Sequence, residues 1–240
     1  MSSPRRPAPT ALLSILALTL AAPAFAQEPK KEEPAPAPAA PPADDPAKLK
    51  EQIAALQKEV AGLKLKVAGL ELEKFGASLT VDKGKDGAEV ATVNILKKWS
   101  GDKDGFALLK TIPNLQVVYI DNPQVGDAAL PALKELPGLT ALTLMSPAVT
   151  DAGLEQVKEL KNLTMLFLTG SKVGDKGLEH LKALPNLQVL ALSRTDVTDA
   201  GLDVLKDVKT LKSVYLIGAK VSPEAVDKFK AAVPGVAVYK

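Results

Sequence analysis

The feature that most constrains the fold of this chain is a repeat of 24 or 25 residues in its second half. Five consecutive copies each contain a form of the pattern LxxLxL, and a looser sixth copy precedes them. Chains with repeats of this length fold as stacks of similar coils, each of which contacts only its neighbours. We therefore expect a solenoid without a single central cleft. The copies occupy residues 89–113, 114–137, 138–161, 162–185, 186–209 and 210–234.

Each copy predicts one strand followed by one helix. Apolar residues recur at positions 2, 5 and 7, so alternate side chains of a short strand face the core. A valine recurs at position 12, and apolar residues at positions 17, 20 and 23 have the spacing of one helix face. In the copy at 162–185 these residues are Leu163, Leu166, Leu168, Val173, Leu178, Leu181 and Leu184. In the first copy we expect the core places from position 12 onward to be filled by Trp99, Phe106, Leu109 and Ile112.

The helix starts can be identified from the motif VTDAGL. Thr150 and Thr198 are suited to cap free backbone amides, and Asp151 and Asp199 follow at the positive end of the helix dipole. In the first copy Asp102 takes the capping place. After the last copy, residues 235–240 predict a half coil in which Val236 and Tyr239 cover the open end.

Residues 1–26 have the three parts of a secretory signal peptide. Arg5 and Arg6 precede a leucine-rich apolar run, and Ala24-Phe25-Ala26 supplies small residues at the cleavage point. The run is too short to span a bilayer comfortably, so we expect cleavage near Ala26 and no stable membrane insertion afterwards. Retention of the segment as an uncleaved anchor is the alternative. The sequence predicts an exported protein and leaves open whether it is periplasmic, in the cell envelope or secreted.

Charge and cysteine content exclude several kinds of partner and site. The formal charge of +2 comes from the two arginines of the signal, so the rest of the chain has equal numbers of basic and acidic residues. A neutral chain disfavours nucleic acid and anionic membranes as partners. The chain contains no cysteine, which removes disulfides, thiolate catalysis and cysteine metal sites.

Between the signal and the repeats, three segments differ in composition. Residues 27–45 are rich in proline and alanine, which predicts either an extended spacer or an unstructured linker. Residues 46–75 predict a helix that starts at Asp45 and Pro46 and ends before Gly76. Residues 76–88 are expected to be a connecting segment that contains a polar turn, DKGKDG.

The predicted helix has apolar residues spaced alternately by four and three. This is a heptad pattern with leucine at d and isoleucine or valine at a, which favours a parallel pair of helices. Oppositely charged residues fall at the g and following e positions, as in Glu59 with Lys64 and Lys66 with Glu71. Two arrangements are open, a homodimeric coiled coil and a helix that folds back as a cap over the first repeat. The heptad residues are Leu49, Ile53, Leu56, Val60, Leu63, Val67 and Leu70.

The most informative surface is the face of the strands that points away from the core. Positions 4, 6 and 8 of each copy lie on this concave face, where packing does not require large apolar residues. Exposed aromatic and methionine side chains are typical of protein-binding sites. β-forming residues are also tolerated on any sheet face, which is the competing explanation. The candidate binding residues are Tyr119, Met145, Met165, Phe167, Tyr215 and Ile217.

The sequence offers little for catalysis or metal binding. His180 is the only histidine, and it falls at a helix position expected to face solvent. Asp102 and Asp104 begin a run like a calcium loop, but Phe106 occupies the third ligand place. Four of the six lysines in a column at position 21 have an acid three residues earlier, so we expect a largely compensated surface. We expect no catalytic residues, no cofactor and no metal. The lysines are Lys110, Lys134, Lys158, Lys182, Lys206 and Lys230.

The run LxxLxLxxTxVTDAGLxxL at residues 187–205 resembles the leucine-rich repeats of F-box substrate receptors and of exported bacterial proteins, notably from planctomycetes. The resemblance covers residues 89–240 and implies an α/β leucine-rich repeat solenoid, with parallel strands on the concave face and helices on the convex face, preceded here by the coiled-coil helix. No F-box segment precedes the repeats, so a ligase role is not carried over. The tenth position departs from the related repeats, which often have cysteine or asparagine there; here it is Pro123, Pro147, Ser171, Thr195 and Ala219.

Two functions follow from these expectations. The first is an exported, non-enzymatic recognition module that binds a protein or peptide on its concave face and is paired through residues 46–75. The second is a structural cell-envelope spacer built on the coiled coil and the proline-rich linker. Removing residues 27–75 distinguishes them, because recognition survives the deletion with weaker avidity and spacing does not.

Overall fold

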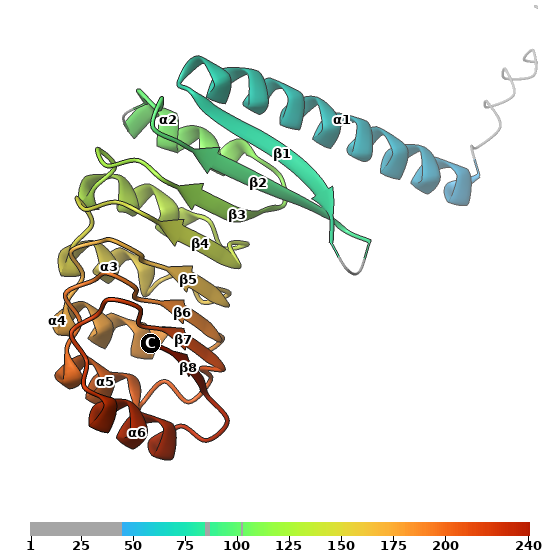
Figure 1. Cartoon of the computed structure of the whole chain (residues 1–240). Helices are drawn as coiled ribbons and strands as arrows, with labels where there is room; N and C mark the ends of the chain where they lie inside the picture. The colour runs from blue at the N-terminus through green and yellow to red at the C-terminus, as the bar shows by residue number, and fades with distance from the viewer. Residues whose placement is uncertain (1–44, 85–86, 102) are drawn as a thin grey trace, which may run out of the picture. The chain divides into compact units, whose positions relative to one another are not determined.

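The computed structural model describes residues 45–84, 87–101 and 103–240. The predicted signal peptide, nearly all of the proline-rich linker and the predicted capping residue Asp102 lie outside this part of the chain. Within it, the strands form one sheet in chain order, and strands β2 to β8 run parallel (Figure 1). The strands are β1 (Ala77–Lys83), β2 (Glu89–Ile95), β3 (Leu115–Ile120), β4 (Ala141–Leu144), β5 (Met165–Phe167), β6 (Val189–Ala191), β7 (Ser213–Tyr215) and β8 (Ala237–Tyr239).

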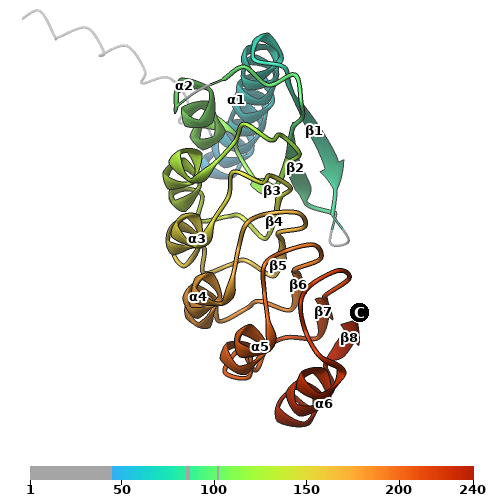
Figure 2. The same ribbon diagram turned by 60° about the vertical axis from the view of Figure 1, so that its left-hand side comes forward.

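The helices of the repeats lie together on one side of this sheet (Figure 2). Several are short or of the 3₁₀ type, which the sequence pattern did not predict. In η2 the cause is local, because Pro131 has no N–H to donate to the carbonyl four residues earlier. The helices are α1 (Pro46–Lys74), α2 (Lys103–Ala107), η1 (Leu108–Thr111), η2 (Asp127–Glu135), α3 (Asp151–Val157), α4 (Asp175–Leu178), η3 (Glu179–Ala183), α5 (Asp199–Leu205) and α6 (Pro223–Ala232).

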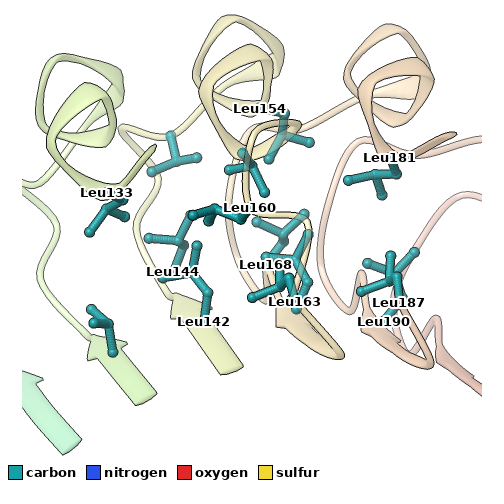
Figure 3. Packing of buried hydrophobic residues seen from close by; sticks show 14 of the residues in the cluster. Leu133, Leu142, Leu144, Leu154, Leu160, Leu163, Leu168, Leu181, Leu187 and Leu190 are labelled. Atoms are coloured by element: carbon teal, nitrogen blue, oxygen red, sulfur yellow. The ribbon is translucent and has the colours of Figure 1, made fainter. Parts of the chain in front are cut away.

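The predicted core positions are confirmed coil by coil. In the copy at 162–185, the residues at positions 2, 5, 7, 12, 17, 20 and 23 are all buried. Leucines from successive coils stack between sheet and helices as layers (Figure 3). In the first copy Trp99, Phe106, Leu109 and Ile112 are buried as expected. Because each layer lies between its neighbours, the core is continuous along the solenoid.

The segment at 76–88 corrects one expectation. It was predicted to be a connection, but it contains β1, which pairs antiparallel with β2 from Ala77 opposite Ile95 to Lys83 opposite Glu89. Residues 85 and 86 of the predicted polar turn lie outside the described part of the chain. Alternation of apolar residues such as Leu79 and Val81 before a glycine-containing turn was the overlooked signal of a hairpin. The strand covers the outer edge of β2.

Helix α1 begins and ends at the predicted residues. Asp45 is its N-cap and accepts a hydrogen bond from the amide of Ala47 at 3.0 Å, and Phe75 is its C-cap. Gly76 follows with φ +81°, and a Cβ there would lie 2.5 Å from the carbonyl oxygen of Lys98. Only glycine fits both the left-handed backbone and this close approach.

An aromatic cluster joins the end of α1 to the first coil. The indole of Trp99 packs between Phe75 and Phe106, with ring centroids 5.7 Å and 5.5 Å away. Edge and tilted contacts of this kind add to the energy of burial. The aromatic residue that replaces the recurrent valine therefore anchors α1 to the repeats.

A row of aspartates at position 14 links each coil to the next. The predicted caps Thr150 and Thr198 are confirmed, since each hydroxyl accepts from the amide two residues later. The same residues are bonded to the preceding coil. The carboxylate of Asp127 accepts from the amide and hydroxyl of Thr150 at 2.9 and 2.6 Å. Asp175 binds Thr198 in the same way at 2.8 and 2.7 Å.

The row continues at its other members. Asp151 accepts from the amide of Gly174 at 2.6 Å, and Asp199 accepts from the amide and hydroxyl of Ser222 at 2.6 and 2.7 Å. Hydrogen bonds to a charged group are stronger than neutral ones. We call Asp127, Asp151, Asp175 and Asp199 the aspartate row. It supplies polar bonds between coils that the leucine pattern does not predict.

In three coils the aspartate of the row is followed two residues later by a glycine, and we call this the DxG motif. Its glycines are Gly153, Gly177 and Gly201, and they leave room for the aspartate row. A Cβ on Gly177 would lie 2.6 Å from Oδ1 of Asp151, and Cβ atoms on Gly153 and Gly201 would meet the aspartates of their own preceding coils. These glycines are therefore required by the close approach of two coils.

The polar residues at positions 9 and 10 form no regular ladder between coils, in agreement with the departure noted in the sequence. Asn122 donates to the carbonyl of Leu96 in the preceding coil at 3.0 Å. Ser171 and Thr195 instead donate to carbonyls of their own coils, those of Leu168 and Leu192. All three side chains are buried, and these bonds satisfy their polar atoms.

We predict that Gly177→Ala destabilises the solenoid by about 1–3 kcal/mol, because the new methyl group overlaps the Asp151 carboxylate. The matched control is Gly62→Ala in α1, where a Cβ meets nothing within 4 Å. Since alanine is the better helix former, the control should gain roughly 0.5–1 kcal/mol. Urea unfolding followed by circular dichroism gives both values. Equal effects of the two variants would contradict the steric role of Gly177.

We predict that Asp199→Ala lowers the melting temperature at pH 7. The amide and hydroxyl of Ser222 hold the pKa of the Asp199 carboxyl below its usual value of 3.8. Its stabilising contribution is therefore present above pH 3.8 and is lost as the pH falls below that value. The difference between variant and parent should shrink in acid.

The control for this experiment is Asp203→Ala, which removes an exposed ion pair with Lys206. Such pairs contribute little to stability, so the control should melt close to the parent. A pH-independent difference for Asp199→Ala in thermal melts from pH 7 to pH 2.5 would contradict the role assigned to the carboxylate.

Candidate functional site

The concave face is formed by the strand side chains that point away from the helices. In β5 the central residue Leu166 is buried, whereas its neighbours Met165 and Phe167 point to the other side. The parallel register aligns equivalent residues of successive coils, so that Phe167 lies between Thr143 and Ala191. The face therefore consists of columns that run across the sheet.

The six residues predicted from the sequence occupy this face or its margin. Met165 and Ile217 are exposed, at 37% and 56%, and the other four are half-buried. Met145 and Ile217 are at position 8 and lie just beyond the ends of β4 and β7. Tyr119, Phe167 and Tyr215 share the column at position 6. Whether the six residues bind a partner stays a prediction.

The structure brings only some of these residues together. Met165 and Phe167 are neighbours on one face of β5. Phe167 and Tyr215 are separated by the strand that carries Ala191, which places them about 10 Å apart at ordinary strand spacing. Tyr119 is two strands from Phe167 on the other side. The candidate residues form a stripe across the sheet rather than one compact cluster.

The small residues within the stripe are covered by the large ones. Ala191 lies between Phe167 and Tyr215 in its column and is only 4% exposed. Ala141 is likewise buried beside Met165. The large side chains therefore project above the buried alanines. They form the part of the concave face that a partner would contact.

Tyr239 corrects a second expectation. It was predicted to cover the open end of the core, but it pairs with Tyr215 in the sheet register and is 47% exposed. The two phenol rings stack at a centroid distance of 4.6 Å and an interplanar angle of 11°. Val236 is buried as predicted. The 24-residue interval between Tyr215 and Tyr239 was the signal that places Tyr239 on the concave face.

The convex face has the compensated charges that the sequence predicted. Lys158, Lys182 and Lys206 each form an ion pair with the acid three residues earlier. Pairs between coils add to these. Lys110 contacts Glu135 at 2.5 Å and Lys182 contacts Asp207 at 3.0 Å. Lys110 lowers the pKa of Glu135, and the hydrogen bonds that Lys182 donates to Glu179 and Asp207 raise the pKa of Lys182.

The histidine and carboxylate side chains of the described part of the chain give no support to a metal site. His180 is half-buried in η3, although the sequence pattern predicted a solvent-facing position. Within residues 45–84, 87–101 and 103–240, no three His, Asp or Glu side chains are grouped as metal ligands. The same residues include no helix that is both long and apolar enough to cross a membrane.

Comparison with solved structures finds similar folds in proteins from two bacteria. Internalin InlF of Listeria monocytogenes matches over 56% of this chain and 37% of its own, with a TM-score of 0.47. Internalin C2 of the same species matches over 61% and 69%, also at 0.47, and a leucine-rich repeat protein of Leptospira interrogans over 59% and 34%, at 0.44. Each is 20% identical to this chain.

Two of these matches extend over little more than a third of the neighbour. No protein-family profile matches the chain, and no curated protein matches it in sequence. The assignment of the fold therefore depends on the coils themselves, in which the 24-residue pattern, the parallel strand and the buried leucines coincide. Residues 89–240 form a leucine-rich repeat solenoid. The concave face of these repeats is the candidate site predicted from the sequence.

Proposed function

We propose that this protein is an exported, non-enzymatic recognition module whose leucine-rich repeats bind a protein or peptide on the concave face. The supporting observation is the aromatic stripe, in which Phe167, Tyr215 and Tyr239 project from a surface that core packing does not occupy. Aromatic side chains offer large contact areas at a small cost in side-chain entropy, and they dominate binding energy at many protein interfaces. An extended partner lying across the strands would contact several columns at once.

We also propose that two copies pair through residues 46–75. The heptad residues of α1 are 46% to 62% exposed, so the predicted stripe is free in the monomer. The helix nevertheless caps the repeats, because Ala68 and Leu72 on its other face are buried. The two arrangements that the sequence left open are therefore compatible with one another. A pair of solenoids would bind a repetitive partner with higher avidity.

The alternative function, a structural cell-envelope spacer, depends mainly on residues outside the described part of the chain and stays a hypothesis. The proposed deletion of residues 27–75 also removes the cap formed by Ala68 and Leu72. Deleting residues 27–44 alone is the cleaner test, since it shortens the linker and leaves α1 in place. A spacer would lose function, and a recognition module would still bind its partner.

We predict that the double substitution of Phe167 and Tyr215 by serine weakens peptide binding at least about tenfold, because each truncated hot-spot aromatic costs about 2 kcal/mol. Peptides are first enriched from a random phage-display library on the immobilised parent protein, and their affinities are then measured by calorimetry. Circular dichroism confirms that the variant is folded.

The matched control is Val81→Ser, which truncates an apolar residue that is 42% exposed on β1, away from the aromatic stripe. It should bind the enriched peptides like the parent. Equal affinity of the parent and the double variant, or no enrichment over the bare surface, would contradict the proposed site.

We predict export with cleavage after Ala26, because Ala24 and Ala26 supply the small residues that signal peptidase requires. Expression in a Gram-negative host should yield a periplasmic protein whose N-terminal sequence begins at Gln27. Replacing Ala26 by arginine should leave the uncleaved precursor with the membranes. Cytoplasmic accumulation of the full-length parent would refute the signal.

A further inference from the structure

One flank of helix α1 carries two successive grooves. The larger has a volume of about 670 Å³ and lies between the heptad residues Leu63 and Val67 on one side and Leu108 of η1 on the other. The second, of about 400 Å³, continues along Ile53 and Leu56 toward Pro113. Both grooves share Val60 and Lys64, so they form one continuous channel beside the exposed heptad stripe.

The flank that carries the channel is defined by the heptad. Gln57, Lys64 and Glu71 are three of its e positions, and all three line the grooves. In a parallel pair of helices the e positions of one chain face the g positions of the other. The g side chains of a partner helix would therefore enter this channel between α1 and the first coil.

The charges on the channel match those of a second copy. In a parallel pair in register, Lys64 would lie opposite the g residue Glu59 of the second copy, and Glu71 opposite the second copy's Lys66. Glu71 is held in the monomer by Lys74 at 2.6 Å, an exposed pair that can exchange at little cost. Isoleucine and valine at a with leucine at d favour the parallel two-stranded form. The charges that line the channel are therefore complementary to those on helix α1 of a second copy.

We propose that the channel binds helix α1 of a second copy of this chain, and that the two helices lie parallel and in register. The interface then includes Leu108, Thr111 and Pro113 of the first repeat in addition to the heptad stripe. This inference rests on the proposed pairing through residues 46–75 and extends it. Because each partner helix contacts the repeats as well as α1, the two solenoids are held at a fixed angle.

Cross-linking tests the arrangement, and the natural absence of cysteine makes introduced thiols unambiguous. The test variant combines Lys66→Cys, at a g position, with Thr111→Cys on the wall of the channel. The matched control combines Lys58→Cys with Thr111→Cys. Lys58 is an exposed lysine of the same helix at position f, which faces away from the seam. The purified full-length proteins are treated with a short bis-maleimide and resolved on denaturing gels.

We expect on the order of tenfold more covalent dimer from the test variant than from the control, because thiols held side by side have a high effective concentration. A third variant, Leu56→Cys, reports the pairing itself, since d residues meet their own copies only in a parallel, in-register dimer. Each single Cys variant at 66 or 111 should give only background dimer.

The outcomes separate the two proposals. If Leu56→Cys cross-links but the test and control variants give equally low yields, the helices pair without lying in the channel. That result overturns this inference alone. Failure of Leu56→Cys together with a monomeric parent at tens of micromolar in sedimentation overturns both the pairing and the channel. The proposed peptide binding by Phe167 and Tyr215 is independent of both results.

Discussion

No coil of this solenoid completes its own core, and the rest of the structure follows from that constraint. The leucines of one coil are covered by those of the next, because a single coil buries too few side chains to offset the entropy of ordering its backbone (Figure 3). The aspartate row adds bonds between the same coils, and the glycines of the DxG motif make room for it. The first coil, which has no repeat before it, is covered by β1 and by Ala68 and Leu72 of α1.

The same constraint leaves the concave face available for binding. Since the core uses one side of each strand, the residues on the other side affect stability only weakly and can vary. The chain places Tyr119, Phe167, Tyr215 and Tyr239 there. The convex face differs, because Lys158, Lys182 and Lys206 are each paired with an acid of the same coil, which compensates these positive charges. The recognition surface proposed above lies on the sheet face.

Helix α1 has two apolar faces, one buried and one exposed. The inner face, with Ala68 and Leu72, closes the solenoid, and the outer face carries the exposed heptad stripe. A helix that is apolar on opposite sides is stable in water only when both sides are covered. Pairing of two copies would satisfy the outer face and present two concave faces in one molecule. Capping and pairing are then two uses of one helix.

The sequence by itself determined the coil, because the spacing of leucines sets which side chains of a strand and helix face inward. It also determined the start and end of α1 and the compensated convex charges, since capping and i,i+3 pairing are local. Tertiary structure decided what depends on neighbouring coils. The hairpin strand β1, the bonds of Asp127 and Asp175 to the following coil, and the stack of Tyr239 on Tyr215 each join residues from different segments. Such contacts depend on which elements lie side by side, and a one-dimensional pattern of leucines does not specify them.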